Sequence, residues 1–445
     1  VFEQNDGTVG IEARSGALTV SGGYASIPAG IDCGASCTTS FEAGVVVTLT
    51  ATPVTGAILD HWSGACGGSL ACTVTMTETK AVTATFVSAV GVTANPQGTD
   101  SISNTVYALV VDPATGKTYV GGDFAGTVDA RGTISRTNLA RLSPDGTVDP
   151  TFTVQTGDWV RALLLVGNYL YVGGDFDGGG TENISDDLGA VAAENVFRID
   201  LTTGRIDRTW LLTTGLSNVY TLGYVTGTTN YLLVGMSGSG YLRALSTANI
   251  ATATTLPNFD ATVHTLAVDG ATLYVGGRSF GTGGAPDYLR RYTFNGSAFT
   301  LDNAWTPVTT NSGIINDYVR ALVVRSGYLY VGGEFDTAST DDHDYLLRIP
   351  TSSATGALDA SWPLQMQNDV YALALDDAML YVGGNFAAPG FSVARFDTNQ
   401  APPALDLTWQ PTGSYVVRDS LPLATDDDDF EDVYAVAAAA DRVTL

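Results

Sequence analysis

The sequence predicts an all-β protein in which a small β domain precedes a β-propeller of about seven blades. Three observations support this fold class. One phrase, V-x-A-L-x-V followed by L-Y-V-G-G, recurs along most of the chain with a mean spacing of about 54 residues, which suits a blade of several strands. Short runs rich in Val, Thr, Leu and Tyr are bounded by Gly- and Pro-containing turns. The first 88 residues lack the phrase and contain all four cysteines.

The first predicted domain, at residues 15–88, follows a short N-terminal segment, residues 1–14. Runs of β-branched residues in this domain are separated by Gly, Pro and Ser, the pattern of short strands joined by turns. The predicted strands are residues 45–51, 73–76 and 81–86. A domain of this size buries a thin core, so we expect cross-links to stabilise it.

The cysteines offer such cross-links. They are Cys33, Cys37, Cys66 and Cys72. Two closely spaced pairs in a Gly-, Ser- and Thr-rich segment favour disulfides, which form outside the reducing cytosol. Local pairing closes two short loops and crossed pairing joins these loops, and both stay open. A four-cysteine zinc site is the third alternative, although the C-x3-C and C-x5-C spacings depart at one end from the usual ligand pattern.

Three motifs occur in order between residues 20 and 87: P-A-G-I-x-C, W-S-G-x-C and V-T-A-x-F. With these motifs the segment resembles the bacterial surface repeat domains related to the internalin B-repeat. The resemblance implies a small secreted β module within a multidomain surface protein. It implies no catalytic residues.

The second predicted domain, residues 89–445, consists of repeats. A complete copy has a first strand of the V-x-A-L-x-V type, a second strand ending in Y-V-G-G, a third strand with an Arg between apolar residues, and a fourth strand ending at D-x-x-W or D-x-x-F. The copy that starts at residue 219 is weaker, with Y-L-L-V-G-M in its second strand and no Asp before Phe259. The copies start at residues 106, 160, 219, 263, 319, 370 and 433. The last copy has only its first two strands, so we expect six complete blades and the start of a seventh.

Closing a ring of blades requires the seventh one, and two accounts stay open. In the account we favour, the natural chain continues past Leu445, where other copies have G-G-x-F. In the other account, the seventh blade is completed within this chain. Residues 92–96 resemble the end of a fourth strand and would then join it from the N-terminal side.

The first two strands of each copy are almost continuously apolar, which predicts that both of their faces are buried between blades. The double Gly favours a bulge, a turn or a close approach of two backbones, because Gly lacks a Cβ. A phosphate-binding loop is the functional alternative. It needs a following helix, and no helical period follows.

The Arg of the third strand is the most regular polar residue of the repeats. It stands at Arg141, Arg198, Arg243, Arg291, Arg348 and Arg395. A ligand site is not expected to recur identically in every blade, so we predict structural ion pairs. The partners are either the acids after the double Gly (Asp123, Asp175 and Glu334) or the Asp of D-x-x-W/F, since Arg binds a carboxylate through two parallel hydrogen bonds.

The motifs V-x-A-L-A-V, L-Y-V-G-G-x-F, L-A-R-L-D and D-x-x-W extend over residues 90–445. In these motifs the region resembles secreted bacterial β-propellers. The resemblance implies the fold and an extracellular location. It implies no particular function, because propellers host enzymes, lectins and scaffolds alike.

Composition excludes several classes of function. The chain has 20 Lys and Arg against 46 Asp and Glu, a net charge of −26. A chain with few bases and no basic stripe binds nucleic acid poorly, because phosphate contacts need clustered cations. No apolar run approaches the ~18–20 residues of a membrane helix. We therefore expect no nucleic-acid partner and no membrane span.

The sequence has no arrangement typical of catalysis. Its three histidines are His61, His264 and His343. They lie in separate segments without the spacing of a metal site or of a catalytic triad. Acidic loops remain, and they are candidates for calcium as the only cofactor we consider. The best candidate comprises Asp175, Asp177, Asp186 and Asp187, although it departs from the EF-hand pattern. Residues 341–344 and 426–432 are further acidic runs.

These observations predict an extracellular or cell-surface protein with a structural or adhesive role, such as a repeating subunit of a surface layer or fibre. Its expected partners are other copies of itself, other surface proteins, or glycans. A glycan-binding propeller is the first alternative and should show exposed aromatic residues at the blade ends. An extracellular polysaccharide hydrolase or lyase is the second and should show convergent carboxylates at the axial mouth. We expect no enzyme activity.

Overall fold

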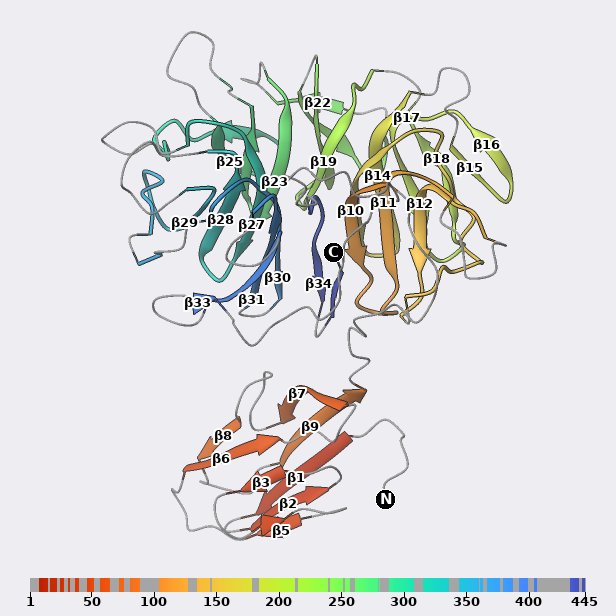
Figure 1. Cartoon of the computed structure of the whole chain (residues 1–445). Coiled ribbons are helices and arrows are strands. Elements are labelled where there is room, and N and C mark those ends of the chain that lie inside the picture. Colours follow the sequence, from red (N-terminus) through yellow and green to blue (C-terminus); the bar gives the residue numbers. More distant parts are fainter. Residues whose placement is uncertain are drawn as a thin grey trace, which may run out of the picture. The chain divides into compact units, whose positions relative to one another are not determined.

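A computed structural model divides the chain into two compact units, Val1–Asn95 and Pro96–Leu445 (Figure 1). In the first unit the structure describes residues 8–14, 17–21, 25–27, 31–32, 37–39, 46–51, 57–64, 72–75 and 81–88. In the second unit it describes residues 104–126, 134–144, 146–177, 184–212, 215–238, 241–250, 253–256, 261–278, 280, 288–307, 315–335, 344–359, 361–362, 366–376, 379–386, 392–398, 404–405, 433–439 and 442–444. Every helix or strand assigned within these ranges is a strand, so the fold is all-β.

The first unit contains two antiparallel sheets with the orders β5-β2-β1-β9-β7 and β4-β3-β6-β8. The strands are β1 Thr8–Arg14, β2 Ala17–Ser21, β3 Ala25–Ile27, β4 Ile31–Asp32, β5 Cys37–Thr39, β6 Val46–Ala51, β7 Ala57–Gly64, β8 Cys72–Thr75 and β9 Ala81–Ser88. The predicted strands at 45–51, 73–76 and 81–86 correspond to β6, β8 and β9. Cys33 and Cys66 lie outside the described residues, so the cysteine pairing remains a prediction.

The N-terminal boundary of this unit differs from the expectation. Residues 1–14 were expected to form a separate segment, but β1 lies inside the five-stranded sheet, paired with both β2 and β9. The pairing of β1 with β2 extends to Arg14 and Ala17, the residues at the adjoining ends of the two strands. The alternation of Val9, Ile11 and Ala13 along β1 is the period of a half-buried strand, which explains why this segment belongs to the sheet.

The second unit is a β-propeller. Its described strands form seven successive antiparallel sheets, apart from the small two-stranded sheet β15-β16. The first three sheets contain β10 Thr105–Val111, β11 Thr118–Ala125 and β12 Thr137–Leu142; β13 Val160–Val166, β14 Tyr169–Asp177, β17 Glu194–Asp200 and β18 Arg205–Leu211; β19 Val219–Val225, β20 Tyr231–Met236, β21 Leu242–Ser246 and β22 Ala253–Thr255. The next three contain β23 Val263–Asp269, β24 Thr272–Gly277, β25 Leu289–Phe294 and β26 Phe299–Leu301; β27 Val319–Arg325, β28 Tyr328–Gly333 and β29 Leu346–Pro350; β30 Val370–Asp376, β31 Met379–Gly384, β32 Val393–Asp397 and β33 Ala404–Leu405. The seventh contains β34 Ala437–Ala439 and β35 Arg442–Thr444.

The innermost strands close the ring. The first strand of each sheet contacts the first strand of the next sheet, and β34 contacts both β30 and β10. Figure 1 shows β34 between these two strands. Ala437 pairs with Thr444 as Ala374 pairs with Tyr381, so β34 and β35 take the places of the first and second strands of a blade. Residues 92–96, the other predicted contributor, lie outside the described residues.

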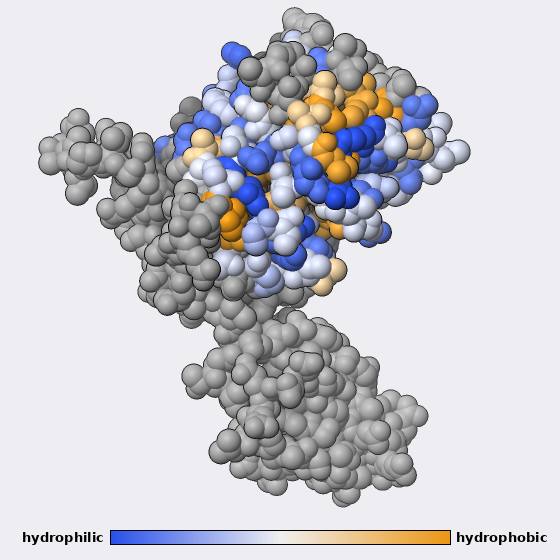
Figure 2. Space-filling view, turned by 90° about the vertical axis from the view of Figure 1, so that its right-hand side faces the viewer, coloured by the Kyte–Doolittle hydropathy of each residue, from blue (hydrophilic) through white to orange (hydrophobic). Residues whose placement is uncertain are grey.

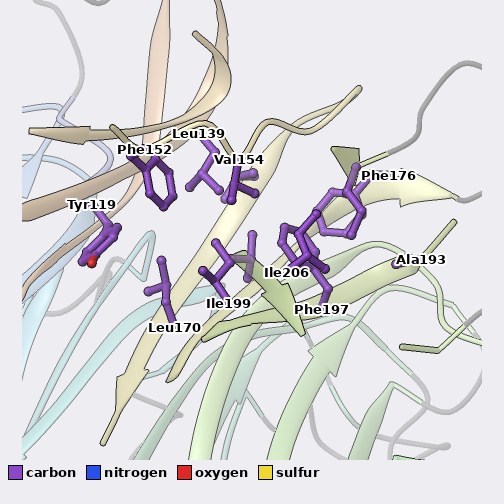
Figure 3. Close-up of a cluster of buried hydrophobic side chains, with 13 residues drawn as sticks. Tyr119, Leu139, Phe152, Val154, Leu170, Phe176, Ala193, Phe197, Ile199 and Ile206 are labelled. Atoms are coloured by element: carbon purple, nitrogen blue, oxygen red, sulfur yellow. The ribbon is translucent and has the colours of Figure 1, made fainter. Parts of the chain in front are cut away.

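The propeller core lies between neighbouring blades. In one cluster, Tyr119 and Phe152 of the first blade pack with Leu170 and Phe197 of the second (Figure 3). In the first six blades the second strand is almost entirely buried, as predicted, but the first strand is only half-buried at many positions. The first strands are innermost, so one of their faces turns toward the propeller axis and not toward another blade.

Candidate functional site

A β-bulge occurs at the same place in the first strand of six blades. In β13, Val160 pairs with Gly174 and Ala162 pairs with Gly173, so Arg161 has no residue opposite it. The equivalent extra residues in the other blades are Tyr107, Tyr220, His264, Arg320 and Tyr371. A bulge changes the direction in which the extra side chain points.

In the seventh sheet the corresponding position of the repeat is occupied by Tyr434. We call these seven residues the axial ring: Tyr107, Arg161, Tyr220, His264, Arg320, Tyr371 and Tyr434. None of them is fully buried, and Tyr434 is 41% exposed. By contrast, Val160 and Val370, which directly precede two ring residues, are completely buried. Next to each bulge, the Val is therefore part of the packing between blades, whereas the extra residue that follows it remains accessible to solvent.

The double Gly that lies opposite five of the six bulges permits two close approaches. A Cβ on Gly174 would lie 2.0 Å from the carbonyl oxygen of Trp159, and a Cβ on Gly173 would lie 2.5 Å from Cγ1 of Val219 in the next blade. The first Gly thus leaves room for the Val of the following blade, and we call this contact a glycine seat. The seats are Gly121–Val160, Gly173–Val219, Gly235–Val263, Gly276–Val319, Gly332–Val370 and Gly383–Val433. The double Gly serves backbone approach and packing between blades, and a strand, not a helix, is the next element after it.

One side of the axial ring is cationic and aromatic. The guanidinium carbon of Arg161 lies 5.0 Å from the ring centroids of both Tyr107 and Tyr220. Tyr220 and His264 meet edge to face with their centroids 5.2 Å apart. Nη1 of Arg320 lies 3.4 Å from Nδ1 of His264. Side chains from four successive blades, together with Tyr107, therefore form a continuous contact chain.

The other side of the axial ring consists of tyrosines. Tyr371 and Tyr434 stack with centroids 5.0 Å apart and an interplanar angle of 13°. Tyr434 also meets Tyr107 at 6.1 Å, and Tyr107 meets Trp159 at 5.9 Å. The Tyr371 hydroxyl lies 3.1 Å from Oδ2 of Asp369, to which it donates a hydrogen bond. This side presents flat aromatic faces with hydroxyl groups at their edges.

The two arginines of the axial ring are paired inside their own blades. Arg161 donates to both carboxylate oxygens of Asp175, with Nη2 2.7 Å from Oδ2. Arg320 pairs with Glu334 through Nε and Nη2, both of which contact Oε1. Burial raises the pKa of Glu334, while Arg320 opposes that rise. These acids are the residues after the double Gly, so their partners are the ring arginines and not the third-strand arginines.

His264 is neutral under ordinary conditions. Burial and the positive charges of Arg320, Arg278 and Arg161 lower its pKa to about 3. Neutral imidazole can accept a hydrogen bond from the Arg320 guanidinium, which a charged imidazolium cannot do. Both Arg278 and Arg320 lie over Tyr318, at 5.5 and 4.8 Å from its centroid.

The third-strand arginines form buried pairs with the Asp of D-x-x-W/F. The four pairs described are Arg141–Asp149, Arg198–Asp207, Arg291–Asp302 and Arg348–Asp359, with nitrogen–oxygen distances of 2.9, 2.7, 2.6 and 2.6 Å. Arg348 also lies 4.6 Å from the ring centroid of Trp362, the last residue of its motif. Four repeats therefore contain an Arg–Asp–aromatic cluster between the third and fourth strands.

Two third-strand arginines differ from this arrangement. Arg243 belongs to the copy that ends at Phe259 without the Asp. Its buried Nε has no hydrogen-bond partner among the residues that the structure describes. Arg395 lies 5.9 Å from the centroid of Tyr381, and Asp406, its predicted partner, lies outside the described residues.

The predicted calcium ligands are not gathered into one site. Asp175 pairs with Arg161 at the axial ring, whereas Asp186 and Asp187 lie at the turn between β15, Ile184–Asp186, and β16, Gly189–Val191. The arginine partners of these two acids are Arg208 for Asp186 and Arg205 for Asp187. Asp177 is described only as the last residue of β14. In the described part of the chain no group of three or more His, Cys, Asp or Glu could hold a metal ion, and calcium remains a prediction.

The same hairpin carries an exposed apolar residue. Leu188 is 61% exposed at its turn. Figure 2 shows that hydrophobic and hydrophilic residues alternate in small patches on this side of the propeller. Residues 341–343 and 426–432, including His343, lie outside the described residues, and only the backbone of β7 is described at His61.

Two family models match parts of the chain. Residues 15–90 match a divergent InlB B-repeat domain, and residues 114–152 match a β-propeller domain of unknown function. No curated protein matches the chain. Neither family description names a catalytic activity. These matches fit a surface repeat domain followed by a β-propeller, and the strand arrangement of the second unit shows the propeller.

Two solved structures align with the chain at low sequence identity. The computationally designed Ika8 protein is 15% identical, with 78% of this chain and 93% of that chain covered and a TM-score of 0.45. A chain of a mitotic checkpoint complex is 14% identical, with 54% and 59% covered and a TM-score of 0.34. Among the described residues, no helix is long and apolar enough to span a membrane.

The axial ring was not identified from the sequence, although a signal was present. His264 stands at a position of the first strand where other copies have Tyr or Arg. Comparing the copies shows that this position varies while its neighbours repeat. A residue that varies inside a strictly repeated motif does not serve the packing that the repeats share, so it is a candidate for recognition.

Proposed function

We propose that the chain is a structural or adhesive protein of the bacterial cell surface, in which the propeller is a rigid interaction module and not a catalyst. The surface repeat domain at residues 15–90 supports the location. Expected partners are other copies of the chain, other surface proteins or glycans. The net charge of −26 disfavours nucleic acids.

The observation that supports this proposal is that the recurring charged side chains of the blades form ion pairs with one another. The Arg of the third strand recurs from blade to blade, and four of these side chains pair with an Asp within a few residues of a buried aromatic ring. These groups stabilise the blades and leave no recurring reactive group for chemistry. Rigidity of this kind suits a protein that presents a surface.

The hydrolase or lyase alternative requires two carboxyl groups that converge on a substrate. Asp175 and Glu334, the acids that contact the ring arginines, each accept hydrogen bonds from an Arg of their own blade. Each of these carboxylates is thus engaged by a guanidinium group that a substrate would have to displace. The geometry therefore favours the structural or adhesive role.

Surface labelling and a deletion test the proposal in the bacterium that encodes the chain. An antibody against the propeller should label intact cells, external protease should remove this signal, and a cytoplasmic marker should stay protected. Deleting the gene should remove a surface layer or fibre, or reduce attachment. Label found only after lysis would refute the surface role. Polysaccharide turnover by the purified chain, lost in Asp175→Asn but kept in Asp187→Asn, would establish the enzyme instead.

A further inference from the structure

We propose that the axial ring is a binding site for a neutral sugar unit of a glycan. The site would hold the sugar against the tyrosines Tyr371, Tyr434 and Tyr107, with the paired arginines supplying hydrogen bonds to its hydroxyl groups. This inference goes beyond the surface role and does not depend on it, because a surface protein without a ligand would still be located on the cell.

The first step is accessibility. A ring that served only to fill the hub of the propeller would bury its aromatic side chains, as the blades bury Trp210 and Trp362. The ring side chains instead keep solvent contact, and Tyr434 is one of three large hydrophobic residues exposed in the described part of the chain. The stacked pair of half-buried Tyr371 and exposed Tyr434 lies where the blades converge, and apolar surface exposed at such a place is a candidate for ligand binding.

The second step is shape. Five neighbouring pairs of the ring have their groups 5.0 to 6.1 Å apart. This spacing forms a compact cluster and not a long groove, so it suits one unit of a ligand better than an extended strand. Tyrosine supplies rigid faces that pack against C–H groups and hydroxyls that bind polar groups, the combination that a sugar ring needs.

The third step is charge. Arg161 and Arg320 are neutralised by Asp175 and Glu334, and His264 is uncharged. A net charged ligand would therefore meet no unpaired opposite charge among the ring residues themselves. Beside the ring, Asp123 accepts a hydrogen bond from Asn104, and Asp369 one from Tyr371, so the surroundings disfavour anions.

Further charged groups beside Tyr318 do not change this balance. Arg278 lies over Tyr318, and Asp317 accepts a hydrogen bond from the Tyr318 backbone N–H. These two add one charge of each sign. Planar guanidinium and carboxylate groups fixed in pairs keep further donors and acceptors for hydroxyl groups, which carry no charge.

Calorimetry with the purified full chain tests the site. The probes are cellobiose, maltotriose, chitobiose and galactobiose, each also used as an analogue with one carboxylate (uronate) or one free amine. At least one neutral probe should bind with saturation, more tightly than its charged analogues. Tyr434→Ala should weaken it at least about tenfold, because a stacked aromatic face and its buried area are lost. Tyr434→Phe, which keeps the ring, should bind within about threefold of the original chain.

Leu188→Ala is the matched control, since it also truncates an exposed apolar residue but lies on the β15-β16 hairpin. It should leave binding unchanged, and circular dichroism melting should show all three variants folded. Arg161→Lys should weaken binding without unfolding the chain, because an ammonium group lacks the planar fork. The proposal is overturned if every neutral probe binds more weakly than roughly 10 mM. Charged analogues that bind as well as the neutral probe, or an unchanged affinity in Tyr434→Ala, overturn it equally.

Discussion

Replacing Gly332 with Ala tests whether the glycine seat holds neighbouring blades together. A Cβ at this position would lie 2.4 Å from Cγ1 and 3.1 Å from Cβ of Val370, which begins the innermost strand of the next blade. Atoms do not approach so closely, so Val370 must move or the two blades must separate. Overpacking a core costs about 1–3 kcal/mol. We expect the upper end, because Val370 is completely buried and its β-branched side chain has few alternative rotamers.

A second substitution relieves the clash and sharpens the test. Val370→Ala alone should cost about 2–3 kcal/mol, since two buried methyl groups and their packing are lost. In the double variant the new methyl at Gly332 enters the space that those groups leave. The combined loss should therefore be smaller than the sum of the single losses by about 1–2 kcal/mol.

Gly223→Ala is the matched control. Gly223 lies in β19, and a Cβ there would meet Leu266 of the next blade at an ordinary 3.5 Å. We expect this variant to be unchanged or up to about 1 kcal/mol more stable, because Ala loses less backbone entropy on folding. Urea unfolding followed by tryptophan fluorescence measures all four variants, and five of the six tryptophans belong to the propeller unit. Equal stability of Gly332→Ala and Gly223→Ala, or additive losses in the double variant, would refute the reasoning.

Three further predictions concern the ionic groups. Arg348→Met should lower the free energy of unfolding by about 3–5 kcal/mol, because Asp359 is left charged without its partner. Arg205→Met, at the exposed pair with Asp187, should lower it by at most about 1 kcal/mol. Urea unfolding measures both values, and similar losses would contradict the distinction between a buried and an exposed ion pair. Burial alone would raise the pKa of Asp359, but hydrogen bonds, including those from Arg348, lower this pKa below its ordinary value. The ion pair therefore stabilises the fold above the unfolded pKa of about 3.9, and this stabilisation is lost as the pH falls through the folded pKa. Acid unfolding of Asp359→Asn should therefore show a shallower loss of stability below about pH 4 than the original chain, and an identical acid limb would count against the ion pair. The pKa of His264 is lowered to about 3, so its imidazole NMR signal should not titrate between about pH 8 and 5. The signal is assigned by its loss in His264→Gln. A titration midpoint near 6.5 would contradict the burial of His264 among arginines.

The fold could be predicted because the sequence repeats the same blade, so that each copy gives separate evidence for its strands. The four-strand pattern recurs in six copies, so errors in one copy are corrected by the others. The first unit has no repeats, and its first strand was missed. Residues 8–14 contain only three apolar side chains, and a strand that short is recognised by its partners β2 and β9 and not by its own composition.

The site was harder to predict because it depends on register. A bulge adds one residue to one strand, and nothing in V-x-A-L-x-V states that the second residue is the unpaired one. The choice between the two sets of acids was open for the same reason. Asp175 and Asp207 are both plausible partners of a blade arginine, and only the pairing of strands places Asp175 beside Arg161 and Asp207 beside Arg198.

The double Gly connects stability with recognition. Its second residue lets the backbone of Gly174 approach the Trp159 carbonyl, and the bulge at Arg161 forms opposite. Its first residue seats the Val of the next blade. Both interactions involve backbone or a constant Val, so the extra residue of each bulge can change without disturbing the fold. Met236 replaces the second Gly in one blade, where Tyr220 is still the extra residue. The first Gly is thus the stricter requirement, and it leaves each ring position free to carry a different side chain.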